Sequence, residues 1–443
     1  MPDPTIPATP KGLVIAAPSS NTGKTVFTLG LVSALRARGI SVEVAKGGPG
    51  YIDPQFLRLA TGQPCYNLDK WAFGDAQLRA RASEITQDKD LLIIEGMMGM
   101  FDGAASTSGS TADLADTLDL PVLLLVDASG LAQSIAAIVH GFATLRKRPK
   151  VCGVVATRIG SQRHADLLAE PLKETGIPLL GTVMRSEALT IPSRHLGLVQ
   201  ATERTQPEAL VDAAREAVEA GVDLDALLAA AGTLSSAPTP RRLSPLGQRV
   251  SIARDIAFEF AYPHMLNDWR MQGAELSGFS PLANEAPCKD CDAIFLPGGY
   301  PELHAGTLSQ ASQFLTGLRS AAARGAIIYG ECGGYMVLGE GLVDAQGARH
   351  AMAGLLSHST SFAQKKMHLG YRAITPESNP IWTMPLQGHE FHMSVLIDPG
   401  NDAPLFHQRD AHGTDLGLSG GQRGAVLGSY THIIDQAPVR GPD

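Results

Sequence analysis

Residues 18–25, with the sequence PSSNTGKT, have the types and the order needed to hold a phosphate group. They follow an apolar run, residues 13–17, and precede a helical pattern over residues 25–38. Their last three residues match the P-loop, although Pro18 stands where that motif has its first glycine. Backbone N–H groups of such a loop point at phosphate, Lys24 adds a positive charge, and the Thr25 hydroxyl can bind Mg²⁺. We predict a nucleotide site formed by Ser20, Asn21, Thr22, Gly23, Lys24 and Thr25; a coincidental turn with a solvated lysine is the alternative.

Carboxylates that could share a Mg²⁺ ion with Thr25 follow two further segments. Glu95 ends the apolar run LLIIE, and Asp53 lies in GPGYIDP. Ligands of open α/β sheets bind at the carboxyl ends of the strands. We therefore predict Thr25, Asp53 and Glu95 as metal ligands, with Asp102 of GMFDG as a third acidic candidate nearby.

Cys332 has the surroundings of a reactive thiol. The apolar run 326–329 leads into Gly-Glu-Cys-Gly-Gly and then into a helical stretch. This order resembles a nucleophile elbow with cysteine in place of serine, and the glycines permit its strained backbone. A helix N-terminus behind Cys332 would favour the thiolate, the reactive form.

A base and an oxyanion hole are expected beside this thiol. His432 follows the apolar run 425–427, so it lies at a strand end within reach of an elbow on a neighbouring strand. A surface histidine is the alternative. A glycine turn, LPGGY, follows another strand. The amides of Gly299 and Gly333 are predicted to stabilise an oxyanion.

Length and composition bound these interpretations. The 443 residues suffice for two or three domains, and 44% are hydrophobic. The formal net charge of −8 argues against a nucleic-acid partner, and no apolar stretch approaches the length of a membrane span. The N-terminus carries no secretion signal pattern, and the five cysteines suggest reduced thiols in the cytoplasm. Cys288 and Cys291 form a lone pair, which favours structural thiols over a zinc site.

Buried strands alternate with helices through most of the chain. Continuous apolar runs at 13–17, 42–45, 91–94, 122–126, 151–156 and 179–183 predict a doubly wound, mostly parallel α/β domain. Residues 236–246, rich in Pro and Arg, read as a linker. A second α/β series starts at residue 250. We predict domains at 1–235 and 247–443.

The motifs together resemble a known family. GECGG, LPGGYPE and SYTH look like a class I, triad-type glutaminase domain with a flavodoxin-like fold. APSSNTGKT, GPGYIDP, NLDKW, IIEGMMGMFDG, STADLA and IPSRHLGL are similar to a dethiobiotin-synthetase-like ATP domain. RDIAFEFAY, FSPL, LGYR and GHEFH extend the match. This order of motifs resembles the cobyrinic acid and hydrogenobyrinic acid a,c-diamide synthases over nearly the whole chain.

The resemblance implies an ATP-dependent, glutamine-hydrolysing amidoligase of cobalamin biosynthesis. Cys332 would release ammonia from L-glutamine with His432 as base. The first domain would use ATP and Mg²⁺ to phosphorylate carboxylates of a corrin macrocycle acid, which ammonia then converts to amides. Tyr51, Asp102, Arg194 and His195 are the candidate contacts to that macrocycle, because arginine suits carboxylates. The sequence leaves the oligomeric state open, a homodimer included.

Three departures from the family pattern affect the site. Gly50 stands where the family has an acid, which weakens the metal site. Ile434 stands where the glutaminase triad often has Glu, and Asp435 would point to the opposite face of a strand. We therefore expect a Cys-His pair whose third member is absent or supplied elsewhere. The third departure is Thr157-Arg158 where relatives often have Asn-Arg.

Two further interpretations stay open at this point. The cluster His389, Glu390 and His392 lacks the spacing of a zinc protease, so a structural or interface role is favoured over a metal site. The macrocycle could be metal-free or hold cobalt, and a nickel-sirohydrochlorin amidating enzyme is a close alternative. A P-loop ATPase switch with a non-catalytic second domain is a hypothesis of a different class.

Overall fold

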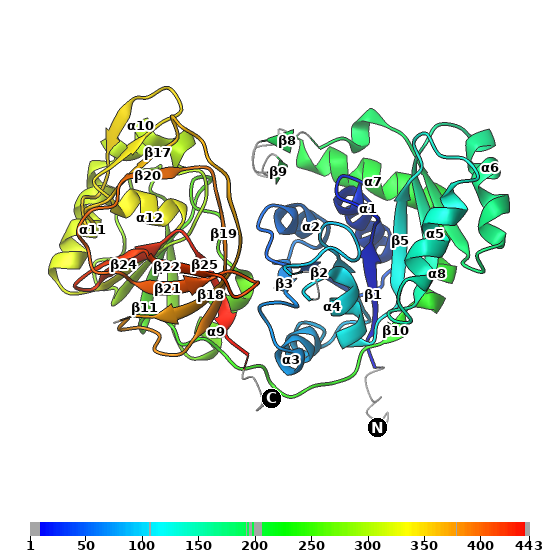
Figure 1. Ribbon diagram of the computed structural model, residues 1–443, viewed down its shortest axis with the longest axis horizontal. Coiled ribbons are helices and arrows are strands. Elements are labelled where there is room, and N and C mark those ends of the chain that lie inside the picture. Colours follow the sequence, from blue (N-terminus) through cyan, green and yellow to red (C-terminus); the bar gives the residue numbers. More distant parts are fainter. Residues whose placement is uncertain are drawn as a thin grey trace. The chain divides into compact units, whose positions relative to one another are not determined.

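The chain folds into two compact units, Met1–Arg241 and Arg242–Asp443 (Figure 1). The computed structural model describes residues 9–105, 108–191, 193–194, 197–198, 206–377 and 379–438. The division between the units falls inside the stretch 236–246. Within the described ranges, no helix combines the length and apolarity that a membrane crossing needs.

The first unit is built on one large sheet with the strand order β3-β2-β4-β1-β5-β6-β7. These seven strands are parallel, and β10 pairs antiparallel with β1. The strands are β1 (Lys11–Ala16), β2 (Val42–Gly47), β3 (Tyr66–Leu68), β4 (Leu91–Glu95), β5 (Val122–Asp127), β6 (Val151–Ile159), β7 (Leu179–Met184) and β10 (Gly232–Thr233). A small separate ribbon joins β8 (Ser193–Arg194) and β9 (Gly197–Leu198).

Helices connect and cover these strands, as the apolar runs predict. They are α1 (Lys24–Ala37), α2 (Asp53–Thr61), α3 (Asp75–Ile85), α4 (Thr111–Leu118), α5 (Ile135–Thr144), α6 (Gln162–Lys173), η1 (Glu187–Leu189), α7 (Pro207–Gly221) and α8 (Leu224–Ala230). Every residue of β2 and β4 is buried; β4 is apolar up to its last residue, Glu95, whereas β2 also buries Glu43 and Lys46. Strand β1 lies in the middle of this sheet, between β4 and β5. Strands β2, β3 and β4 lie on one side of β1, and β5, β6 and β7 lie on the other, so the strand order reverses at β1. The loop after β1 therefore lies where such sheets bind ligands.

The second unit contains a six-stranded sheet in the order β12-β11-β13-β14-β24-β23. All neighbours in it are parallel except β23 and β24. Its strands are β11 (Arg249–Ala253), β12 (Glu275–Phe279), β13 (Ala293–Leu296), β14 (Ile327–Glu331), β23 (Gly421–Arg423) and β24 (Val426–Ser429). The helices of this unit are α9 (Pro263–Met271), η3 (Pro301–Leu303), α10 (Ala305–Gln310), α11 (Ser312–Ala323) and α12 (Gly333–Leu338).

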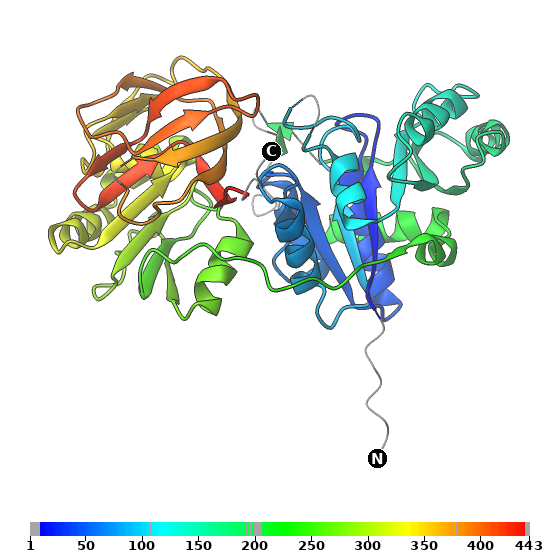
Figure 2. The same ribbon diagram turned by 60° about the horizontal axis from the view of Figure 1, so that its bottom comes forward.

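Two further sheets of this unit have no counterpart in the sequence predictions. One has the order β22-β21-β18-β19-β25 and is antiparallel throughout; the other has the order β16-β15-β17-β20. Figure 2 shows the orange and red strands gathered on one side of the unit, above its green elements. The strands are β15 (Gly341–Val343), β16 (Arg349–Ala351), β17 (Ser359–Ser361), β18 (His368–Pro376), β19 (Leu386–His392), β20 (Val395–Asp398), β21 (Phe406–Arg409), β22 (Asp415–Ser419) and β25 (His432–Gln436).

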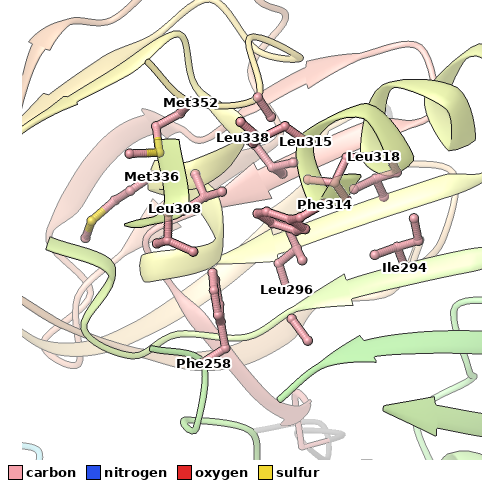
Figure 3. Packing of buried hydrophobic residues seen from close by; sticks show 14 of the residues in the cluster. Phe258, Ile294, Leu296, Leu308, Phe314, Leu315, Leu318, Met336, Leu338 and Met352 are labelled. Atoms are coloured by element: carbon pink, nitrogen blue, oxygen red, sulfur yellow. The ribbon is translucent and has the colours of Figure 1, made fainter. Parts of the chain in front are cut away.

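A hydrophobic core fixes the elements that surround Cys332. Phe314, Leu315 and Leu318 share one face of α11 and pack toward Ile294 and Leu296 of β13 (Figure 3). Side chains of this type are typically worth about 1.5–3 kcal/mol each when buried, so the cluster holds β13, α11 and α12 in fixed positions. Further members of the cluster are Phe258, Leu308, Met336, Leu338 and Met352.

Candidate active sites

The loop between β1 and α1 has the left-handed backbone that a phosphate cradle needs. Asn21 has φ 62° and Gly23 has φ 89°, and Gly23 caps α1. The Lys24 ammonium reaches back across the loop and donates to the carbonyl oxygens of Ser19 (3.1 Å) and Met98 (2.6 Å). Burial, followed by the positive charge of Lys46, lowers the pKa of Lys24 to about 8. The predicted nucleotide residues therefore form one continuous turn at the start of α1.

Thr157 and Arg158, noted in the sequence only as a departure from the family pattern, hold this loop in place. The Thr157 hydroxyl donates to the carbonyl oxygen of Thr22 (3.1 Å), and the Arg158 guanidinium donates to that of Asn21 (2.8 Å). Arg158 also forms an ion pair with Asp127 at the end of β5. Residues near the end of β6 thus hold the phosphate loop in position through these hydrogen bonds.

The three predicted metal ligands meet around a lysine that the sequence analysis missed. The Thr25 hydroxyl donates to Oε1 of Glu95 (2.9 Å). The Lys46 ammonium lies 2.7 Å from the same Glu95 oxygen and 2.6 Å from Oδ2 of Asp53. Burial alone would lower the pKa of Lys46, but the negative charges of Asp53 and Glu95 outweigh it and raise this pKa. A lysine inside the buried strand VEVAKG was the available signal.

The donor set fits a hard divalent cation. It offers a hydroxyl and two carboxylates, the oxygen ligands that Mg²⁺ prefers. Burial raises the pKa of Glu95, and among the described residues its Oε2 atom has no hydrogen-bond partner. An ion at this carboxylate would supply the missing partner. A Cβ atom built on Gly50 would lie 3.8 Å from Cε of Lys46 and 4.0 Å from Oδ2 of Asp53. A side chain at residue 50 would therefore point at this cluster.

The four candidate contacts to the macrocycle differ in burial and in how much of each the structure describes. Tyr51 is buried, 8% exposed, just before α2. Asp102 is exposed, and its Oδ2 atom accepts a hydrogen bond from the Gly99 amide (2.9 Å), so it closes a turn. Arg194 ends β8, where only the backbone is described, and His195 lies outside the described residues. Their roles toward a substrate stay predictions.

In the second unit, Cys332 occupies a sharp turn between β14 and α12. Its φ of 47° and ψ of −104° are strained for a residue with a side chain. Its amide donates to the carbonyl oxygen of Ser429 (2.8 Å), which joins the turn to β24. A Cβ atom on Gly334 would lie 1.9 Å from the Leu296 carbonyl oxygen. The glycines around the thiol are therefore needed for close packing, whereas the strained backbone is at Cys332 itself and not at Gly333 or Gly334.

Cys332 and His432 lie on either side of Gly298. A Cβ atom built on Gly298 would lie 2.3 Å from Cε1 of His432 and 3.1 Å from Cβ of Cys332. His432 is the first residue of β25 and is fully buried. Its Nδ1 atom lies 3.6 Å from Oε2 of Glu331, the residue directly before the thiol. The structure thus brings the predicted nucleophile and base together and adds a carboxyl group beside them.

The predicted oxyanion residues also meet here. A Cβ atom on Gly333 would lie 3.1 Å from the amide nitrogen of Gly299, so both backbones approach each other next to Cys332. The Gly333 amide hydrogen-bonds the Cys332 sulfur and acts to lower its pKa. The two backbones are therefore adjacent beside the nucleophile, as an oxyanion hole requires, and the roles of the two amides stay predictions.

The resting thiol differs from the sequence expectation of a favoured thiolate. Burial raises the pKa of Cys332, and the negative charge of Glu302 adds to this shift. The helix behind the thiol, α12, has only six residues, so its dipole is weak. Burial also lowers the pKa of His432 to about 3, against the effect of a hydrogen bond to the Phe260 backbone. At neutral pH the pair is therefore a thiol beside a neutral imidazole, which can take the thiol proton.

The cluster His389, Glu390 and His392 lies against this site. The Cys332 thiol lies 3.9 Å from the Phe391 carbonyl oxygen, and His389 pairs with His432 across β19 and β25. Glu390 hydrogen-bonds His392 (2.8 Å) and Arg372 (2.8 Å). Burial would raise the pKa of Glu390, but these two partners lower it to about 2.

A metal ion is disfavoured at this cluster. The potential ligand atoms of His368, Glu390 and His392 lie within 4.8 Å of one another. However, both oxygens of Glu390 are already held, one by Arg372 and the other by His392, so no carboxylate oxygen remains for an ion. The predicted structural role for His389, Glu390 and His392 remains the simpler interpretation.

Comparison with known proteins identifies the family. Residues 13–199 match the CobQ/CobB/MinD/ParA nucleotide binding domain, and residues 249–438 match the CobB/CobQ-like glutamine amidotransferase domain. The hydrogenobyrinate a,c-diamide synthase of Rhizobium meliloti strain 1021 is 51% identical over 424 residues, which cover 96% of this chain and 99% of that protein. The chain belongs to the hydrogenobyrinate a,c-diamide synthase family. A protein of the same name from a Sinorhizobium species is 50% identical, and the match covers 96% of this chain and 99% of that protein. Another, from Brucella anthropi, is 49% identical, and the match covers 96% of this chain and 98% of that protein.

Membership in the hydrogenobyrinate a,c-diamide synthase family confirms the predicted fold and enzyme class. A P-loop domain that binds a nucleotide precedes a glutamine amidotransferase domain, and the chain is an ATP-dependent, glutamine-hydrolysing amidoligase. The hypothesis of a P-loop ATPase switch is not favoured, because full-length relatives are named as synthases.

Proposed function

We propose that the chain amidates the a and c side-chain carboxylates of hydrogenobyrinic acid, with ATP and glutamine as co-substrates. The end-to-end identity with the Rhizobium meliloti synthase is the observation that carries this proposal. The two sites support it, because one has the groups to bind phosphates and the other has a thiol beside a neutral imidazole.

In the second unit, the Cys332 sulfur attacks the side-chain amide carbon of glutamine while its proton passes to His432. The amides of Gly299 and Gly333 stabilise the resulting oxyanion, an effect typically worth about 100-fold or more in rate. His432 then protonates the leaving nitrogen, ammonia departs, and a thioester remains. Water, deprotonated by His432, attacks the thioester carbon, and the sulfur leaves to regenerate the thiol and release glutamate.

In the first unit, a substrate carboxylate oxygen attacks the γ-phosphorus of ATP, and ADP leaves. Lys24 and the loop amides hold the phosphates and stabilise the charge that develops on them. Ammonia then attacks the carbonyl carbon of the acyl phosphate, loses a proton, and phosphate leaves, so an amide remains. Mg²⁺, held by Thr25, Asp53 and Glu95, would neutralise charge on the phosphates.

The identity of the macrocycle is tested by the reaction itself. Purified protein is given ATP, glutamine and, in separate reactions, hydrogenobyrinic acid, cobyrinic acid or nickel-sirohydrochlorin. We expect mass spectrometry to show replacement of two hydroxyl groups by amino groups on hydrogenobyrinic acid. Faster turnover of either metal-containing macrocycle would contradict the proposed substrate while leaving the enzyme class intact.

The assignment of the nucleophile is tested by Cys332→Ser. This variant should lose glutamine-dependent amidation and keep amidation driven by ammonium salts, because only the second unit needs the thiol. Cys291→Ser is the matched control, since Cys291 is also a buried thiol of the same core. Glutamine-dependent turnover that survives in Cys332→Ser would disprove the nucleophile assignment.

A further inference from the structure

Glu331 is a fully buried carboxylic acid placed between the nucleophile and the base. It ends β14 directly before Cys332 and is 0% exposed. Its Oε1 atom accepts a hydrogen bond from the amide of Ile433 (3.0 Å), the residue after His432. Its Oε2 atom lies 3.6 Å from Nδ1 of His432. One carboxyl group thus hydrogen-bonds the backbone next to the base and lies within ion-pair distance, not hydrogen-bond distance, of its ring.

The position is costly for a carboxyl group. Burial raises the pKa of Glu331 to about 8, although the Ile433 amide and the Tyr329 hydroxyl both act to lower it. An acid in such an environment normally destabilises the fold unless a partner ionises with it. His432 becomes a cation when it takes the proton of Cys332, and it would then be such a partner.

We propose that Glu331 is the positioning residue of His432, and so the third member of the glutaminase site that the sequence does not place after the histidine. This inference rests on the proposed roles of Cys332 and His432. The carboxyl group fixes the ring orientation so that the other nitrogen faces the thiol. It also stabilises the imidazolium that forms during attack on glutamine, as an acid does in other nucleophile-histidine sites.

Asp435 is the competing candidate. It is buried on the same strand as His432 and is paired with Gln387 across β19. A β-bulge interrupts the register between Gln387 and Gly388, so simple alternation of faces does not decide where the Asp435 side chain points. In contrast, Glu331 has measured distances to both the ring and the following amide of His432.

Four titratable groups close to the pair have pKa values far from 8. Burial lowers the pKa of His389 to about 3, and the pKa of Glu390 is about 2. Burial raises the pKa of Tyr430 and Tyr329 well above their usual range. The pH dependence of glutamine hydrolysis around pH 8 therefore separates the effect of Glu331 from theirs.

The test compares Glu331→Gln and Asp435→Asn in the full chain. Each variant is assayed for glutamine hydrolysis between pH 6 and 10 and for ammonia-driven amidation of the macrocycle acid. The substitution Glu331→Gln keeps the oxygen that accepts the hydrogen bond from the Ile433 amide and removes the negative charge. We expect Glu331→Gln to lower kcat for glutamine about 100-fold or more, with little change in KM, and to lose the pH dependence near pH 8. Ammonia-driven amidation and Asp435→Asn should stay near wild type.

The opposite outcomes overturn the inference. A kcat close to wild type in Glu331→Gln would remove Glu331 from the site. So would the reverse result, in which Asp435→Asn shows the loss of kcat expected for Glu331→Gln and Glu331→Gln does not. If Glu331→Gln fails to fold, Glu331→Asp decides, because it keeps the charge but moves it away from His432. A Glu331→Asp variant that folds and keeps full glutamine turnover contradicts the proposal. Failure of ammonia-driven amidation in the wild type would instead refute the proposed function.

Discussion

The ammonium group of Lys46 lies 2.7 Å from Oε1 of Glu95 inside the first unit, with the two side chains only 5% and 1% exposed. The same ammonium holds Asp53 at 2.6 Å, so one cation compensates two carboxylates that are also the predicted metal ligands. Lys46 therefore affects both the stability of the first unit and the charge of its predicted metal ligands.

Lys46→Met should destabilise the first unit by about 3–5 kcal/mol, because it leaves the buried Glu95 and the partly buried Asp53 without a counter-charge. Urea unfolding without Mg²⁺ measures this change, and added Mg²⁺ should restore part of the stability. Lys70→Met is the control: Lys70 pairs with Asp75, whose side chain is 57% exposed, and such pairs are worth about 0–1 kcal/mol. Equal losses in the two variants would contradict the buried role of Lys46.

Gly50→Asp should lower the Mg²⁺ concentration needed for half-maximal amidation several-fold. There is room for the side chain, since its Cβ atom would meet no atom closer than 3.8 Å, and it would point at Lys46 and Asp53. Gly50→Asn is the matched neutral control and should leave the Mg²⁺ requirement unchanged. The interpretation of residue 50 is wrong if the two variants respond alike to Mg²⁺.

Gly298→Ala should abolish glutamine hydrolysis and spare ammonia-driven amidation. The added methyl group would lie 2.3 Å from Cε1 of His432, so the imidazole must move away from Cys332. Gly278→Ala in β12 provides the comparison, because its Cβ atom would meet nothing within 4 Å. Normal glutamine turnover in Gly298→Ala would mean that the arrangement of His432 and Cys332 beside Gly298 is not the active one.

Nucleotide affinity should decrease as the pH rises through 8. Burial lowers the pKa of Lys24 to about 8, so the free protein loses this positive charge above that pH, whereas a bound polyphosphate favours the charged form. ATP binding at pH 8.5 should therefore take up protons, which calorimetry in buffers of different ionisation enthalpy detects. Lys24→Arg, whose guanidinium stays charged, should bind with an affinity independent of pH in this range. An affinity that is constant from pH 7 to 9.5 in the wild type would contradict this account.

Most of the parallel strands could be predicted from sequence because burial on both faces leaves an apolar run, whereas β3 and the largely exposed β12 were not predicted. The runs 13–17, 91–94 and 326–329 became β1, β4 and β14 for this reason. The antiparallel sheet of β18, β19, β21, β22 and β25 gave no such signal. Strand β18 mixes exposed and buried residues, so its composition did not identify it. Of its two partners, β19 is the next strand along the chain and β21 comes later.

The sequence also placed the reactive residues better than the residues that support them. Cys332, His432 and Thr25 lie at turns and strand ends, where a motif is visible. Lys46 lies inside a strand, and Glu331 contacts His432 only because β14 and β24 are neighbours and β25 follows. Contacts of this kind depend on strand order, which local patterns do not report.

His432 opens β25, the last strand of the described chain. Cys332, in the turn after β14, is made much earlier, and strands β18, β19, β21 and β22 of the antiparallel sheet are made between the two. A growing polypeptide therefore presents the thiol long before it has a base. Partly made or prematurely terminated chains that end before β25 would carry the sulfur but could not hydrolyse glutamine. Ammonia production from glutamine thus begins only after β25 has been made.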